Sequence, residues 1–235
     1  MKILEVSEHY ASDYSLIMGL VDLLPVILFT LAGIILIKTL FNVLKKPFAA
    51  MLCSGVTLSL TAGLFKAIWK ILVSLNVCDF YPLNYMFMPA QSLGFILIGV
   101  GLLSMLFDKG ITAKTRANAV VWPLFLLVLT GVPATQYDGN ILFIAMLVIG
   151  EIMICISLSY LAIRNKQWIC LVLFIISFIS LMVMGAMKPL STKMKLSVTD
   201  ANWIEEAVNI VAQLSLLIGC FLMNKKGFFA YNNHQ

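Results

Sequence analysis

Residues 168–187, WICLVLFIISFISLMVMGAM, include no charged side chain. Because a helix rises about 1.5 Å per residue, about 20 apolar residues cross the hydrocarbon core of a bilayer. Six other stretches have the same character, so the sequence predicts seven membrane-spanning helices. Their expected bounds are 18–41, 48–72, 85–107, 119–132, 141–163, 168–187 and 203–223, of which the fourth is the shortest.

The composition of the chain agrees with a membrane protein. Of its 235 residues, 61% are hydrophobic and only 11% are charged, against about 25% charged residues in a soluble domain. The longest segment between stretches, residues 188–202, is expected to be a loop. Segments this short leave no room for a soluble domain. We therefore expect one all-α transmembrane domain over residues 1–235.

The distribution of basic residues predicts the orientation. Cytoplasmic segments of membrane proteins are enriched in lysine and arginine. Here the segments beside the ends of the first, third, fifth and seventh stretches hold most of them: Lys38, Lys45, Lys46, Lys109, Lys114, Arg116, Arg164, Lys166, Lys225 and Lys226. This pattern predicts a multi-pass protein of the cell membrane, with its N-terminus outside and its C-terminus in the cytoplasm. Lys188, Lys193 and Lys195, in the last outer segment, depart from it.

The net charge of +5 is spread over separate short segments. It therefore gives no reason to expect a nucleic-acid partner, and the expected partner of most of the surface is the lipid bilayer.

An internal duplication is suggested at a constant offset of 122 residues. At that offset Gly63 and Lys66 match Gly185 and Lys188, and the Ala-Gln pair ending at Gln91 matches a second Ala-Gln pair. If the duplication is real, three helices, a linker helix and three more helices in the same orientation make up the chain. This arrangement resembles the topology of sugar facilitators of the SWEET type, although their proline-glutamine signature is not found in the first and fifth stretches.

Glu151 is the most unusual residue of the apolar stretches. It lies near the middle of the fifth, within VIGEIMI, where a charged group costs about 2.5–3.5 kcal/mol on insertion scales. Such a residue is expected to face the bundle interior or a wet cavity. It could bind a proton or cation or orient a solute, or it could form a hydrogen bond that joins two helices.

The seventh stretch carries a polar stripe. Glu206, Asn209 and Gln213 are spaced by three and four residues and so share one helical face. The stripe is suited to hydrogen-bonding a polar solute or coordinating a cation, and equally to joining helices. Just before it, Asn202 and Glu205 form a pattern similar to a capping box.

Three more candidate residues are expected in the outer halves of their helices: Asp22, Lys66 and Gln91. Lys66 and Lys70 lie one turn apart and repel each other unless an anion is near, for which Glu206 or Asp22 is available. Each lysine could instead extend to the headgroups. Together with Glu151, these residues predict a cavity that opens to the outside and is closed by apolar side chains toward the cytoplasm.

The sequence contains no catalytic or metal motif. A phosphate-binding glycine loop, a nucleophile elbow and a His-Glu-x-x-His zinc site are all absent. The only histidines, His9 and His234, lie near the two ends. We therefore expect no cofactor and no metal, and a function other than catalysis is favoured.

Two functions remain open. The first is a transporter or facilitator of a small polar or charged solute, with Glu151 as the coupling or gating carboxylate. The second is a receptor-like or accessory membrane protein, which senses a ligand in the same cavity and signals to a partner protein through its cytoplasmic loops.

Overall fold

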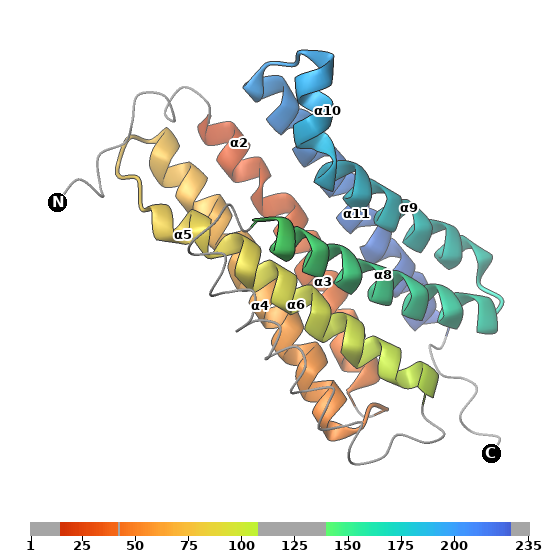
Figure 1. The fold of residues 1–235 in the computed structure, drawn as a ribbon. Coiled ribbons are helices and arrows are strands. Elements are labelled where there is room, and N and C mark those ends of the chain that lie inside the picture. Colours follow the sequence, from red (N-terminus) through yellow and green to blue (C-terminus); the bar gives the residue numbers. More distant parts are fainter. Residues whose placement is uncertain (1–14, 42, 108–139, 227–235) are drawn as a thin grey trace.

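The structure, a computed structural model, describes residues 15–41, 43–107 and 140–226, and these are helical with no strand among them. The predicted all-α fold is confirmed for this part of the chain. Its helices are α2 (Leu16–Val21), α3 (Leu23–Leu40), α4 (Lys46–Ser74), α5 (Tyr81–Tyr85), α6 (Phe87–Leu103), the 3-10 helix η1 (Ser104–Phe107), α8 (Asn140–Arg164), α9 (Trp168–Gly185), α10 (Met187–Met194) and α11 (Val198–Lys225) (Figure 1).

Six helical segments are long and apolar enough to cross a membrane. The short helices α2 and α5 extend α3 and α6, so that they share two of these segments, Leu16–Leu40 and Tyr81–Leu103. The predicted fourth stretch, 119–132, lies outside the described residues. The described part is thus a multi-pass membrane domain in its composition and helix lengths.

The six long helices form a closed ring in chain order. Each packs against the next described one, from α3 to α4, α6, α8, α9 and α11, and α11 returns to pack against α3. Glycines bring several pairs close. A Cβ on Gly150 of α8 would lie 2.7 Å from the backbone of Phe95 in α6, and one on Gly101 of α6 would lie 3.1 Å from the backbone of Phe48 in α4. Helices this close have their backbones in van der Waals contact.

Two pairs of neighbouring helices run in the same direction. Gly150 of α8 faces Phe95 of α6, and further along both helices Met153 faces Gly99, so α6 and α8 are parallel (Figure 1). In the same way α3 and α11 are joined near their beginnings through Lys70, and near their ends Thr39 donates a hydrogen bond to Asn224 at 3.1 Å. The end of α6 and the beginning of α8 therefore lie at opposite ends of the bundle.

Prolines set three of the helix breaks. Pro25, Pro89 and Pro189 are each the third residue of a helix. A proline lacks an N–H for the carbonyl four residues earlier and its ring collides with that group. In each case that earlier residue is the last of the preceding helix, which ends at Val21, Tyr85 or Gly185. One residue then separates the two helices, and for α2 and α3 it is Asp22.

The segment 188–202 differs from the expected loop, because it contains most of α10 and the first turn of α11. Helix α11 is capped by Ser197, whose Oγ accepts a hydrogen bond from the Asp200 backbone N–H at 3.1 Å. The predicted cap at Asn202 was therefore wrong. Asp200 lies in the first turn of α11 and completes this cap, because its carboxylate accepts a hydrogen bond from Ser197 Oγ at 2.6 Å.

The apolar core fills the end of the bundle that holds the beginning of α4 and the end of α11. Its fully buried side chains include Leu40, Leu52, Leu102, Leu158 and Met223. The same end carries the basic residues Lys45, Lys46, Arg164, Lys166 and Lys225 of the described chain. The polar site lies toward the opposite end.

At the offset of 122 residues, α6 corresponds to α11 and α8 corresponds to α3, so one parallel pair of helices matches the other. The whole ring of six helices matches itself in the same way. A ring in chain order has this regularity without any duplication, however. The matched glycines also differ, since a Cβ on Gly63 would lie 2.7 Å from Val26 whereas one on Gly185 would meet nothing within 4 Å. The duplication remains a prediction.

Candidate functional site

A pocket of about 650 Å³, a volume that includes open space at its mouth, lies among the helix halves away from the basic end of the bundle, and we call it the outer pocket after the orientation that the sequence predicts. Helices α3, α4, α6, α9 and α11 and the break before α3 contribute its walls. Six of the seven residues predicted from the sequence line it: Asp22, Lys66, Gln91, Glu206, Asn209 and Gln213. The structure thus brings together side chains that lie up to 191 positions apart, from 22 to 213.

Helix α11 supplies the longest polar wall of this outer pocket. Glu206, Asn209 and Gln213 face it together, as their spacing predicts. Gln213 Nε2 donates to Asn209 Oδ1 at 3.4 Å, a long and weak hydrogen bond. The two amides are therefore loosely joined within one helix.

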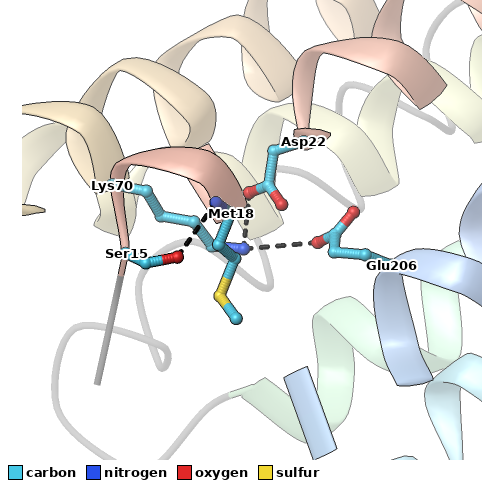
Figure 2. Close-up of polar contacts among 5 residues, drawn as sticks. All are labelled: Ser15, Met18, Asp22, Lys70 and Glu206. Atoms are coloured by element: carbon cyan, nitrogen blue, oxygen red, sulfur yellow. Dashed lines mark hydrogen bonds and ion pairs between the residues drawn. The ribbon is translucent and has the colours of Figure 1, made fainter. Parts of the chain in front are cut away.

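An ion cluster closes one side of the outer pocket. Lys70 Nζ lies 2.5 Å from Asp22 Oδ2 and 3.2 Å from Glu206 Oε1 (Figure 2). The three side chains are at least 92% buried and come from the α2–α3 break, α4 and α11. Two carboxyl groups therefore share one ammonium. The cluster ties three helices together at the end of the bundle that lies opposite the basic residues.

Lys70 is the residue that sequence reasoning undervalued. The sequence offers Asp22 and Glu206 as anionic partners of the two lysines, and in the structure both contact Lys70. Lys66 lines the pocket with its ammonium over the ring of Phe87, 4.4 Å from the centroid. Helical spacing places both lysines on one face of α4, and no local pattern in the sequence distinguishes the one that contacts Asp22 and Glu206.

Glu151 lines a second, deeper cavity, whose volume of about 570 Å³ includes space that is open to the surroundings. All six long helices contribute to its wall, so it lies on the axis of the ring. Glu151 is 4% exposed. Most of the wall is apolar, and the polar side chains in it are Glu151, Cys155, Ser177 and Gln213.

Two phenylalanines lie between the outer pocket and the deep cavity. Phe29 and Phe95 line both, and their rings stack with centroids 5.7 Å apart and planes inclined by 16°. Gln213 also lines both. The sequence predicts one chamber floored by Glu151; the structure has two compartments that share a wall of two rings and an amide.

Several buried polar atoms of the two compartments have no protein partner. Among the described residues, six buried side-chain oxygens or nitrogens lack a hydrogen bond, and five of them belong to compartment-lining residues: Asp22 Oδ1, Ser59 Oγ, Glu151 Oε2, Glu206 Oε2 and Gln213 Oε1. Buried polar groups are costly when unpaired. Four of the five atoms are carboxyl or amide oxygens, and an amide oxygen or an ionised carboxyl only accepts hydrogen bonds. The compartments are therefore suited to a ligand that donates hydrogen bonds or carries positive charge.

The described residues contain no group of three His, Cys, Asp or Glu side chains arranged to hold a metal ion. Comparison with known proteins identifies no relative: no protein-family model, curated protein or solved structure matches the chain. The likeness to the topology of sugar facilitators therefore remains an expectation from the sequence.

Proposed function

We propose that this protein binds a small polar or charged solute in the outer pocket and transports it across the cell membrane, with Glu151 as the coupling or gating carboxylate. The observation that carries the proposal is the stack of two compartments along the ring axis. The outer one is polar, the deep one has a single acid, and two rings separate them. Transporters place their substrate sites near the middle of the bilayer, where helices converge.

The proposal includes an orientation with the N-terminus outside and seven spans. The shared direction of α6 and α8 supports the seventh, because the chain between them has to return from one end of the bundle to the other. The basic residues at the end opposite the outer pocket support a cytoplasmic location for that end. Cysteines introduced at positions 113 and 136, on either side of the proposed span 119–132, are expected to react with an impermeant maleimide from opposite sides of the membrane.

Flux into proteoliposomes tests transport. Purified protein is assayed with a panel of labelled sugars, amino acids and organic amines, and Glu151→Gln is compared with Asp200→Asn. The second variant likewise replaces a carboxylate by its amide, at an exposed residue that lines neither compartment. We expect a saturable flux that falls at least tenfold in Glu151→Gln and is retained in Asp200→Asn. Equal flux in both variants would remove Glu151 from the mechanism.

A receptor-like protein is the second candidate, and the closed end of the bundle favours it. Leu40, Leu52, Leu102 and Met223 are fully buried there, and none of them lines the outer pocket or the deep cavity. A protein of this kind would pass a signal to a partner protein at the cytoplasmic loops. Saturable binding of a panel solute without any flux would favour this function over transport.

A further inference from the structure

We propose that the deep cavity binds an organic monocation with apolar substituents, such as a protonated amine or a quaternary ammonium ion, whose charge lies against Glu151. This inference deepens the proposed function, on which it rests, by assigning a substrate class to the inner compartment.

The wall of the deep cavity matches such a ligand. Its side chains are mainly aliphatic or aromatic, and four of them are phenylalanines: Phe29, Phe95, Phe174 and Phe178. An aromatic ring face attracts a cation within about 6 Å of its centroid, and a ring also packs well against alkyl groups. The cavity therefore offers contacts to the apolar body and to the charge of the same molecule.

Glu151 supplies the only ionisable carboxyl among the residues that line the cavity, and no lysine or arginine lines it. Its Oε2 is buried without a protein partner. A single positive charge on the ligand would compensate the carboxylate, and an N–H of a protonated amine would satisfy the unpaired oxygen. Gln213 Oε1, which also lacks a hydrogen-bond partner, offers one more acceptor where the deep cavity adjoins the outer pocket.

The other ligand classes fit the lining less well. A divalent cation such as Ca²⁺ takes six to eight oxygen ligands, and the lining offers one carboxylate, one amide and one hydroxyl. A sugar would leave most of its hydroxyls facing hydrocarbon, which is costly. An anion would be repelled by Glu151.

The outer pocket favours the same charge. It is lined by the carboxylates of Asp22, Glu205 and Glu206 against the ammonium of Lys66, while Lys70 is engaged by two of the three acids. From this pocket the route to Glu151 passes the stacked rings of Phe29 and Phe95. These rings present apolar contact to an alkyl or aryl group and cation–π attraction to its charge.

Binding of benzyltrimethylammonium to the purified full chain tests the proposal, because the charge of this probe is independent of pH. Its competitors are neopentylbenzene, the neutral isostere, and benzenesulfonate, an anion of similar size. We expect saturable binding of the cation and none of the anion. Glu151→Gln is expected to weaken cation binding about 30-fold or more, since truncating one partner of a buried charge pair has effects of this size. The isostere should bind both forms alike, and Asp200→Asn, at an exposed carboxylate that lines neither compartment, should bind the cation like the wild type.

A second measurement uses the unaltered protein. Dicyclohexylcarbodiimide, which is apolar and reacts with carboxyl groups in apolar sites, is expected to label Glu151 in a peptide map, and the cation should protect it. Phe95→Leu, which removes a ring and keeps an apolar side chain, should weaken cation binding more than isostere binding.

The outcomes separate this inference from the proposed function. Cation binding that is equal in wild type and Glu151→Gln, or labelling of Glu151 that the cation leaves unchanged, would overturn the inference. Failure of the cation to bind, together with saturable binding of a sugar or amino acid from the flux panel, would also overturn it and leave the proposed function standing. If no solute of either series binds, both are wrong.

Discussion

Replacing Lys70 with methionine is expected to destabilise the protein strongly. Methionine keeps much of the length of the lysine side chain and removes its charge, so that Asp22 and Glu206 remain buried beside each other without a counter-ion. The matched control is Lys66→Met, one turn earlier in α4. Lys66 lies over the ring of Phe87, a contact worth about 0.5–2 kcal/mol.

The size of the effect follows from the geometry of the cluster. At an effective dielectric constant of about 20, unit charges at the observed separations of 2.5 and 3.2 Å attract by about 7 and about 5 kcal/mol. Desolvation of three buried ions, at several kcal/mol each, offsets most of this gain. Removing one partner leaves the desolvation of the others in place, and for buried pairs it costs about 3–5 kcal/mol.

Thermal unfolding in detergent measures this loss through the protein's own thiols. Cys170 and Cys220 are 2% and 0% exposed, so in a background without the partly exposed Cys53, Cys78 and Cys155 a thiol-reactive fluorophore reaches the remaining thiols only after unfolding. On the scale of about 2–4 °C per kcal/mol for chains of this size, Lys70→Met should lower the midpoint by about 6 °C or more. The control should change it by less.

The triple variant Asp22→Asn, Lys70→Met, Glu206→Gln distinguishes charge balance from packing. Replacing every charge of a buried cluster is often neutral or stabilising, so the triple variant should recover most of the loss. Equal midpoints for Lys70→Met and Lys66→Met, or a triple variant as unstable as Lys70→Met alone, would refute the electrostatic reasoning.

Two further predictions concern packing and orientation. Gly150→Ala would place a Cβ 2.7 Å from the backbone of Phe95 and should destabilise the bundle by about 1–3 kcal/mol, while Gly185→Ala, with nothing within 4 Å, should unfold at the wild-type midpoint or slightly above it. In a variant that keeps Cys78 as its only cysteine, an impermeant maleimide should label the protein in intact cells. In a variant whose only cysteine is supplied by Lys166→Cys, labelling should require permeabilised cells. The reverse result would invert the proposed topology.

Composition and periodicity were sufficient to predict the helical architecture and the main polar face. Long apolar runs identify the helices because lipid offers no partners to a backbone outside a helix. The stripe of Glu206, Asn209 and Gln213 follows from helical spacing alone, and the structure places its members on one wall. The ends of helices were predicted less well, as the unexpected α10 and the cap at Ser197 illustrate.

Contacts between helices could not be predicted in the same way. The sequence does not reveal that Lys70, rather than Lys66, reaches both carboxylates, because the rotation and tilt of α4 decide which lysine faces Asp22. Nor does it reveal that Phe29 and Phe95, 66 positions apart, stack between two compartments. In a chain with 15 phenylalanines, no local pattern distinguishes two that line a ligand route from those that face lipid.

The proline breaks also bear on how the outer mouth could change shape. At each of the three, the helical hydrogen bond from the proline position is missing, although the intervening residue still donates its own to the residue four positions earlier: Asp22 to Met18, Met86 to Pro82 and Ala186 to Met182. The short helices α2, α5 and α10 can therefore each tilt about one break relative to the long helix beside it. Because Asp22 is itself the residue between α2 and α3 and is bound to Lys70, a movement of α2 about this break would strain a buried ion pair together with the backbone, which couples the shape of the mouth to the charge of α4.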